Sequence, residues 1–474
     1  MAEHLPMQQF PGNARAALQN DAQRRALRAA ADVFDERRRT AMATAPDWQF
    51  WRHQARAVKD HTLLYLDHYL EQFERNALQR GTRVHWARDA KEAGELVLGL
   101  ARQAGATLCV KSKSMTTEEV RLNEVLEHAG IDAVETDLGE WIQQLADEVP
   151  FHIVVPAIHK SRGQIATLFA EKIGTPRDAD AEALTAAARD RLRAKFAAAG
   201  VGISGANFLI AETGSLLILE NEGNVRLTTS VPRVHVALVG IEKLLPRVAD
   251  LDVFLRLLPR SGTGQTMTTY QSLLTGPKRE PGDQGPEELH VVLLDNGRSR
   301  MLEQDITRQS LACIRCGACL NVCPVYQQVG GHAYGSVYPG PIGAVVTPQL
   351  VPLATAAQLP FASTLCGACR DVCPVAIDIP ALLLHLRQQV REGSAKERAA
   401  APRWFERFAM RLVAFWLRGP RRYRFALAIA RCCDRWFGWL LRRLPPLRQW
   451  SKGRTAPRLA ARDFRTLWRE RGKT

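Results

Sequence analysis

The sequence predicts a multidomain chain of the α/β class that also carries helical domains. Three observations lead to this prediction: a segment where short apolar runs alternate with helical patterns, a repeated cysteine motif, and a basic tail rich in aromatic residues. The length of 474 residues gives room for about three domains of roughly 150 residues each. We expect a helical region at 1–90, an α/β domain at 91–300, a cysteine-rich domain at 301–392 and a basic helical domain at 393–474.

The N-terminal region is rich in Ala, Arg and Gln. Its apolar residues recur at spacings of three and four from Leu63 to Leu70, which is typical of helices. The opening residues, MAEHLPMQQF, lack the basic and then apolar segments of a secretory signal. We therefore expect a cytoplasmic protein whose cysteines stay reduced.

The α/β domain alternates between the two kinds of element. Helical patterns cover Thr117–His128 and Asp178–Ala199. Short apolar runs predict strands at Thr107–Val110, His152–Pro156, Phe208–Ala211, Leu216–Glu220, His235–Val239 and His290–Leu294. This alternation predicts a largely buried sheet covered by helices.

Seven of the ten cysteines lie between residues 313 and 373. The first motif, CIRCGACLNVCP, runs from Cys313 to Pro324 and has the spacing C-x2-C-x2-C-x3-C-P. The second, CGACRDVCP, runs from Cys366 to Pro374 and repeats this register, with Ser363 in the first cysteine position. The region therefore contains an internal repeat.

This spacing is typical of iron–sulfur proteins. Three thiolates two residues apart on a curled loop can each reach a different iron of one cubane, while the cysteine before proline ligates the other cluster. We therefore predict two 4Fe-4S clusters, the first held by Cys313, Cys316, Cys319 and Cys373, and the second by Cys323, Cys366 and Cys369. Zinc also binds four thiolates, but its sites use two C-x2-C pairs and do not explain the repeated run with proline.

The second cluster has only three cysteine ligands in this assignment. Ser363 could ligate as an alkoxide, an iron could carry water or a small ligand, a partner could supply the last ligand, or the cluster could be of the 3Fe-4S type. We favour three thiolates and an open iron. Between the motifs, the Gly-, Pro- and Tyr-rich segment Val329–Thr347 is too irregular for a long helix, and we expect it to pack over the cofactors.

The chain resembles a known family. The strings CIRCGACLNVCPVYQQVGGHAYGSVYPGPIGAVVTP, LPFASTLCGACRDVCPVAIDIP and GANFLIAETGSLLILENEGNVRLTTSVPRVHVALVGIEKLLP are similar to lactate utilization protein B, an iron–sulfur subunit of a bacterial L-lactate oxidation system. The resemblance implies that residues 91–300 form a lactate-utilisation (LUD) domain, related in fold to sugar-phosphate isomerases and CoA-transferases. It also implies two partners, a cysteine-rich CCG-motif protein and a LUD-only protein.

Two cubanes can pass electrons singly, but neither accepts a hydride. No G-x-G-x-x-G motif follows a strand, because Gly262-Thr263-Gly264 lacks the third glycine. With the resemblance, this favours an electron-transfer subunit of an L-lactate dehydrogenase complex that does not act as an enzyme by itself. The alternatives are a self-sufficient LUD oxidoreductase for 2-hydroxy acids, whose own clusters accept the electrons, and an iron–sulfur regulatory sensor.

The α/β domain could also hold a small anion. A carboxylate substrate would suit Lys160, Arg226 or Arg233, and Glu212 could act as the base. Ordinary turn chemistry explains the same segments, because Gly-Asn and Thr-Gly pairs are common where strands end. Both interpretations remain open from the sequence.

The basic charge is confined to the tail. Residues 387–474 contain 24 Lys and Arg but only 6 Asp and Glu. Residues 1–386 contain 40 Lys and Arg and 43 Asp and Glu. Six of the ten tryptophans lie there too. We expect two basic amphipathic helices, broken at Gly419-Pro420 and stopped at Pro445-Pro446. Such helices suit an acidic partner subunit or the anionic inner face of the cell membrane; without a recognition motif, nucleic acid is not expected.

Overall fold

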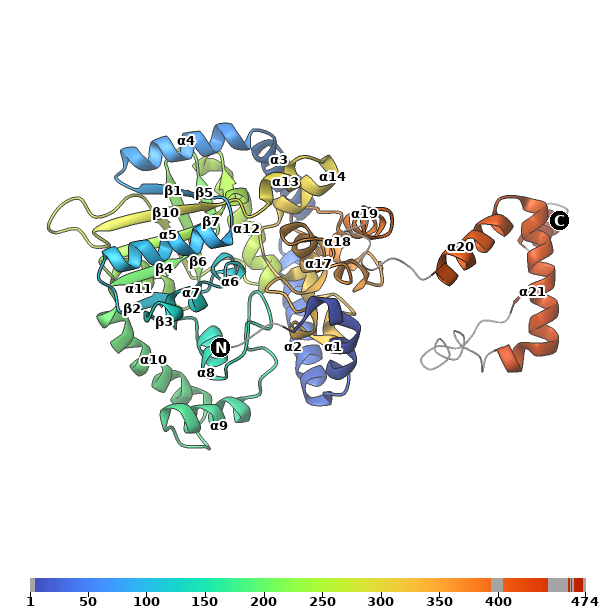
Figure 1. The fold of residues 1–474 in the computed structure, drawn as a ribbon, viewed down its shortest axis with the longest axis horizontal. Coiled ribbons are helices and arrows are strands. Elements are labelled where there is room, and N and C mark those ends of the chain that lie inside the picture. Colours follow the sequence, from blue (N-terminus) through green and yellow to red (C-terminus); the bar gives the residue numbers. More distant parts are fainter. Residues whose placement is uncertain (1–4, 394–403, 442–458, 461, 463, 472–474) are drawn as a thin grey trace. The chain divides into compact units, whose positions relative to one another are not determined.

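The computed structural model describes residues 5–393, 404–441, 459–460, 462 and 464–471. Met1–Ala400 form one compact unit and Ala401–Thr474 a second, and each is described by itself (Figure 1). The larger unit combines a central sheet with covering helices and a helical cysteine-rich region. The predicted α/β class is confirmed.

A six-stranded parallel sheet organises the larger unit. Its order is β1 (Arg83–Ala87), β10 (Glu288–Leu294), β7 (Val234–Gly240), β4 (Val201–Ser204), β2 (Leu108–Lys111) and β3 (Asp132–Glu135). From β2 the chain continues to its outer neighbour β3, whereas from β4 it continues to β7 on the other side. The direction of winding therefore reverses between β2 and β4.

The two faces of this sheet are covered differently. Along β7, Val234, Val236 and Leu238 pack with α5 (Ala90–Gln103) and α7 (Leu122–His128). Ala237 and Val239 point the other way, where they pack with α4 (Leu66–Gln79) and a second sheet. That four-stranded sheet has the order β8 (Leu244–Leu245), β5 (Phe208–Ile210), β6 (Ser215–Glu220) and β9 (Tyr270–Leu274).

Five of the six predicted strands form, and the prediction for His152–Pro156 is wrong. The reason is local: the His152 ring atom Nδ1 accepts hydrogen bonds from the backbone N–H groups of Val154 and Val155, at 3.0 and 3.1 Å. The N–H of Phe151 also donates to the carbonyl of Pro156 at 3.2 Å. These bonds fold the segment into a compact loop instead of leaving it extended.

The N-terminal region is helical only as far as Gln79. Helices α1 (Phe10–Ala17), α2 (Asp21–Ala43), α3 (Trp48–Leu64) and α4 confirm that part of the prediction. The remainder is wrong, because β1 forms within residues 1–90. Its partner β10 lies about 200 residues later, with Arg83 opposite His290, so no local pattern could reveal the pairing.

The cysteine-rich region follows β10 and contains α15 (Ala318–Asn321), α17 (Gly340–Leu350), α18 (Ala368–Val372) and α19 (Ile379–Glu392). The N-terminal helices contact it: Arg52 of α3 donates through Nε to the carbonyl of Cys373 at 2.8 Å. Most of Val329–Thr347 is buried, including every residue from Gly340 to Thr347. Its second half is nevertheless regular, because it forms the first part of α17.

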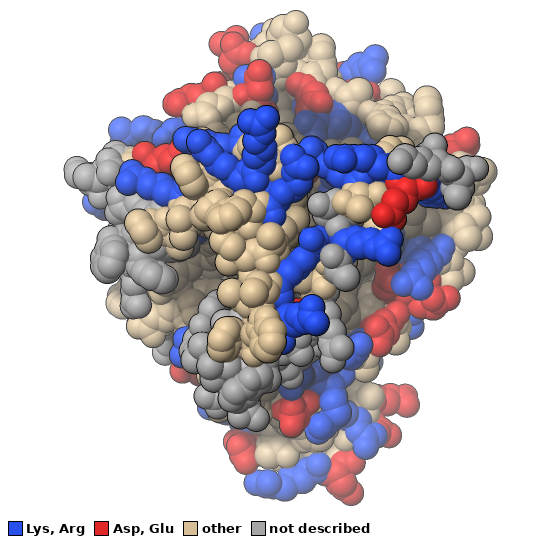
Figure 2. Space-filling view, turned by 90° about the vertical axis from the view of Figure 1, so that its right-hand side faces the viewer, with Lys and Arg blue, Asp and Glu red and all other residues tan. Residues whose placement is uncertain are grey.

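The smaller unit contains the predicted helices α20 (Trp404–Leu417) and α21 (Pro420–Leu441), broken at Gly419-Pro420, and a further helix α23 (Phe464–Arg471). The rings of Trp416 and Phe425 stack at 6.0 Å, so α20 and α21 pack together. Figure 2 shows one face of the molecule on which Lys and Arg side chains gather among uncharged residues. Pro445-Pro446 lie outside the described residues. Within the described part of the chain, no helix is long and apolar enough to cross a bilayer.

Because two histidines are buried, we expect the free energy of unfolding to fall in mild acid. Burial lowers the pKa of His235 on β7 to about 3 and that of His152 to about 4. The folded chain therefore keeps both rings neutral, while the unfolded chain protonates them below about pH 6.5. Between that pH and about 4, each histidine should lower the free energy of unfolding by about 1.4 kcal/mol per pH unit as the pH falls. Anaerobic urea denaturation at pH 7 and pH 5 measures this change, and equal stability at the two values would contradict it.

Candidate metal centre and the cavity beside it

Four of the predicted ligand cysteines share one chamber. The thiols of Cys313, Cys316, Cys319 and Cys373 line it, together with apolar side chains that include Ile153, Ile342 and Ile377. Burial raises the pKa of Cys316, and the neighbouring thiols of Cys373 and Cys313 raise it further. The last cysteine of the second motif therefore lies with the first three of the first motif.

The other three cysteines form a second group. Burial raises the pKa of Cys369 to about 12, with smaller contributions from the nearby thiols of Cys323 and Cys366. Cys323 and Cys369 are buried, whereas Cys366 is exposed. The two groups thus differ in their access to solvent: the second reaches the surface through Cys366.

The two motifs repeat in backbone conformation as well as in sequence. Arg315 and Leu365 adopt left-handed backbone angles, with φ of 60° and 57°. Gly317 and Gly367, two residues later, have φ of 78° and 88°. At Gly317 a Cβ atom would also lie only 2.9 Å from Val154 Cγ2, so glycine is needed there for both conformation and space. Each loop curls its cysteines around a common centre.

Ser363 occupies the place in the second loop that Cys313 occupies in the first. The Sγ of Cys313 accepts a hydrogen bond from the N–H of Arg315 at 3.4 Å. In the same register, the Oγ of Ser363 accepts a hydrogen bond from the N–H of Leu365 at 3.1 Å. The hydroxyl is therefore held as the equivalent thiol is held.

The donor atoms of both groups fit iron–sulfur clusters. Several thiols crowd together in apolar surroundings, and their pKa values are raised by burial and by one another. Such thiols ionise only if cationic metal is bound between them. In addition, the N–H of Ile377 donates to Cys373 Sγ at 3.4 Å, and hydrogen bonds to cluster sulfurs tune reduction potentials.

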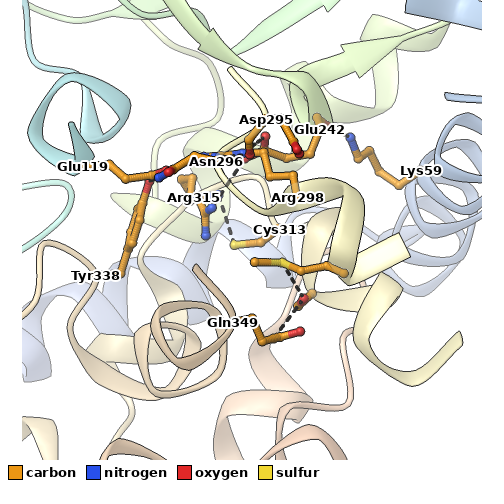
Figure 3. A network of polar contacts seen from close by, with 12 residues as sticks. Lys59, Glu119, Glu242, Asp295, Asn296, Arg298, Cys313, Arg315, Tyr338 and Gln349 are labelled. Carbon is orange, nitrogen blue, oxygen red and sulfur yellow. Dashed lines mark hydrogen bonds and ion pairs between the residues drawn. The ribbon is translucent and has the colours of Figure 1, made fainter. Parts of the chain in front are cut away.

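A buried ion network lies beside the first group (Figure 3). Arg298 contacts Glu119 through two N–O pairs of 2.9 Å and Glu242 through Nε at 2.5 Å. Arg315, from the first cysteine loop, reaches Glu242 at 3.5 Å and stacks 4.5 Å from the centre of the Tyr338 ring. Burial alone would raise the pKa of Glu242, but Arg298 and Arg315 bring it down to about 2. The network ties the sheet to the first cysteine loop.

A cavity of about 360 Å³ adjoins this network. Its lining includes the segments that follow β2, β3, β4 and β7, the end of β6, part of α12 (Leu251–Gly262) and the first cysteine loop. It includes Ser112, Lys113, Ser114, Asp137, Gly205, Asn207, Glu220, Glu222, Glu242, Lys243, Ile314, Arg315, Cys316 and Tyr338. The carboxyl ends of the parallel strands thus face the cysteine-rich region across a polar space.

The structure does not bring the four sequence-predicted substrate residues together. Lys160 pairs with Glu148 at 2.6 Å, and the exposed Arg233 pairs with Glu287 at 3.0 Å. Arg226 lies over the ring of Tyr270 at 5.1 Å, and Glu212 accepts the N–H of Val248 at 2.8 Å. None of these four residues lines the cavity.

The sequence interpretation missed Lys113, Lys243 and Arg315, which do line the cavity. A usable signal exists for the two lysines, because Lys113 follows the end of β2 by two residues and Lys243 follows the end of β7 by three. Arg315 lies inside the first cysteine motif. Its role as a wall between cavity and chamber depends on packing that spacing alone does not reveal.

Three family models together cover most of the chain. Residues 70–294 match the LUD domain, residues 309–377 match the 4Fe-4S dicluster domain, and residues 385–473 match the C-terminal domain of lactate utilisation protein B. The cysteine-rich region is thus an iron–sulfur domain. The LUD match begins before β1, so it takes in part of the region first expected to be only helical.

Curated relatives resemble the chain over nearly its whole length. Lactate utilization protein B of Oceanobacillus iheyensis is 40% identical and that of Geobacillus thermodenitrificans 41%, each match covering 96% of this chain and 95% of the relative. An uncharacterized electron transport protein of Escherichia coli is 38% identical, over 97% of this chain and 96% of its own. A crystal structure of a DUF162 family protein from Deinococcus radiodurans matches 48% of this chain and 98% of its own, with 15% identity and a TM-score of 0.28. The chain belongs to the lactate utilization protein B family.

Proposed function

We propose that this protein is the iron–sulfur electron-transfer subunit of a system that oxidises L-lactate to pyruvate and so allows growth on lactate. Its membership of the lactate utilization protein B family supports lactate as the substrate of this system. The observation that carries the electron-transfer role is the presence of two cysteine groups on repeated loops within one compact unit. Oxidation of lactate to pyruvate releases two electrons, and two clusters can each accept one of them.

In this proposal Cys313, Cys316, Cys319 and Cys373 hold one 4Fe-4S cluster, and three thiolates hold the other, those of Cys323, Cys366 and Cys369. The different burial of the two groups supports a direction for electron flow. In the first group Cys319 and Cys373 are buried and Cys316 lines the cavity, while in the second group Cys366 is exposed. Electrons therefore exchange with external partners through the second cluster.

The proposed partners are a cysteine-rich CCG-motif subunit and a LUD-only subunit in the cytoplasm. The tail supports docking, because Arg418, Arg421 and Arg424 are exposed, as are the neighbouring Tyr423 and Phe425. This surface suits an acidic face of a partner subunit. The same chemistry also suits peripheral contact with the anionic inner face of the membrane.

A second candidate is a self-sufficient 2-hydroxy-acid oxidoreductase. The polar cavity beside Cys316 favours it, because a ligand there would lie next to the first cluster of the same chain. Neither cluster accepts a hydride, however, so the chain alone has no acceptor for direct hydride transfer. The subunit role therefore remains the proposal.

Growth tests the proposal. A strain without this gene should fail to grow on L-lactate but should grow normally on pyruvate, because only the step between them is lost. The wild-type gene should restore growth, and Cys316→Ala should not. Cys432→Ser changes an exposed cysteine of the tail and serves as the matched control. Growth of the deletion strain on L-lactate at the wild-type rate would contradict the proposal.

Ser363→Cys should make the second cluster more resistant to oxygen. A thiolate in that register would complete the ligand set, because the Ser363 hydroxyl is held as the Cys313 thiol is held. We expect the visible iron–sulfur absorbance to decay several-fold more slowly in air. Thr364→Cys, one residue away and out of register, is the control and should decay like the wild type. Identical decay of all three proteins would count against this view of Ser363.

A further inference from the structure

The cavity beside the first cysteine loop lies where an open α/β sheet binds ligands. In such sheets the binding crevice is found outside the carboxyl ends of the strands, at the point where the winding reverses. Here that point lies between β2 and β4. The cavity is lined by Ser112–Ser114, which follow β2, and by Gly205–Asn207, which follow β4. Its volume of about 360 Å³ is in the range of small-molecule sites.

One cation of the cavity has no partner among the described residues. Lys113 is neutralised by Asp137 at 2.8 Å, and Arg315 reaches Glu242 at 3.5 Å. Lys243 is only 9% exposed and lines the cavity. Within the part of the chain that the structure describes, its ammonium makes no ion pair or hydrogen bond. A largely buried lysine whose ammonium faces a cavity without an ion-pair partner favours an anionic group there.

The remaining charges limit the kind of anion. Asp137, Glu220, Glu222 and Glu242 also line the cavity. Their carboxylates repel a doubly charged phosphate more strongly than a singly charged carboxylate, and one unpaired ammonium can neutralise only one negative charge. Asn207 adds an oriented polar group: its Oδ1 accepts the N–H of Leu219 at 2.8 Å, which leaves the amide NH2 group as a donor.

The cavity and the thiol chamber share a wall. Ile153, Ile314, Arg315 and Cys316 line both spaces. Gly262 closes the cavity against this loop, since a Cβ there would lie 3.0 Å from the carbonyl oxygen of Cys316. A ligand in the cavity would therefore be separated from the first cluster by a single layer of residues.

We propose that this cavity binds a small monocarboxylate of the 2-hydroxy or 2-oxo acid class, with Lys243 as the cation that binds its carboxylate and Asn207 as a donor to its 2-oxygen. The inference rests on the proposed function, which supplies the substrate class. It assigns this chain a binding site for substrate or product in addition to its clusters. Binding of the acid beside Cys316 also changes the surroundings of the first cluster.

Calorimetry on the full chain tests the proposal, with both clusters present under anaerobic conditions. The probes are L-lactate, pyruvate and inorganic phosphate. Lys243→Gln should weaken binding of the carboxylates about ten- to a hundredfold, because a charged hydrogen bond is lost. Lys243→Arg should retain most of the affinity. Lys160→Gln, which changes a lysine outside the cavity, should bind like the wild type.

A second readout separates binding from folding. Iron content and visible absorbance should match the wild type in Lys243→Gln. Pyruvate should shift the electron paramagnetic resonance spectrum of the reduced first cluster in the wild type and in Lys243→Arg, but not in Lys243→Gln. Unchanged affinity in Lys243→Gln, or phosphate bound more tightly than both carboxylates, would overturn the proposal. No binding of either carboxylate would also overturn it, while reduction of the clusters through partner subunits would still support the electron-transfer role.

Discussion

Cys373→Ala should remove the first cluster and spare the second, whereas Cys323→Ala should do the reverse. The thiol of Cys373 lies in the chamber of the first motif, although it belongs to the second motif in sequence. The pKa of Cys323 is raised first by burial and then by Cys366 of the second motif. Each variant should therefore hold about four irons per chain instead of about eight. Both variants should fail to support growth on lactate.

Spectroscopy can show which of the two clusters remains in each variant. Cys319 and Cys373 of the first group are buried, whereas Cys366 of the second is exposed, so the two clusters should differ in electron paramagnetic resonance spectrum and in accessibility to oxidants. The spectrum left in Cys373→Ala should be that of the second cluster alone. The spectrum left in Cys323→Ala should match that of Cys366→Ala, since both lose the second cluster. If Cys373→Ala instead resembled Cys366→Ala, the crossed ligand assignment would be wrong.

Arg298→Met should destabilise the larger unit by about 3–5 kcal/mol, because it leaves the buried Glu119 without its cation and Glu242 with only the more distant Arg315. Arg298 is almost fully buried and contacts both Glu119 and Glu242. Glu119 also accepts a hydrogen bond from the Tyr338 hydroxyl at 2.6 Å. Loss of the guanidinium therefore disturbs the contact between the sheet and the cysteine-rich region, and the clusters should be lost more readily on heating.

Arg256→Met is the matched control for this variant. Arg256 also pairs with a carboxylate, that of Asp252 at 2.8 Å, but on an exposed surface of α12 (Leu251–Gly262). Such surface pairs contribute little to stability, so the melting temperature should not change measurably. Equal melting temperatures for Arg298→Met and Arg256→Met would contradict the role given to the buried network.

The grouping of the cysteines could be predicted from sequence because it depends largely on local spacing. From Cys313 to Cys319 the loop itself brings three thiols together, and the cysteine before proline in each motif is expected to join the other group. Strand β1 is a different case, because it is a short edge strand whose pairing with β10 depends on residues far along the chain. The loop at His152–Pro156 has the apolar composition of a strand, but its apolar residues pack onto the cysteine-rich region instead of into the sheet.

The residues that the sequence suggested for substrate binding lie away from the cavity for a related reason. Lys160 follows the loop at His152–Pro156, which is not a strand, so it does not lie at a carboxyl end of the sheet. Arg233 immediately precedes β7 and thus lies at the amino end of that strand. Glu212 belongs to the turn between β5 and β6 of the second sheet. Lys243 could have been considered from the sequence, because it follows the predicted strand His235–Val239 by four residues.

In the proposed role, this chain transfers electrons from lactate oxidation through its clusters, as a subunit of a larger system. The most direct measurement adds L-lactate to the anaerobic chain, alone and together with the CCG-motif and LUD-only proteins, and follows cluster reduction by visible absorbance and electron paramagnetic resonance. We predict reduction only in the presence of the partners. Reduction of the isolated chain would make it a self-sufficient oxidoreductase, and no reduction in the complete mixture would contradict a role in electron transfer from lactate.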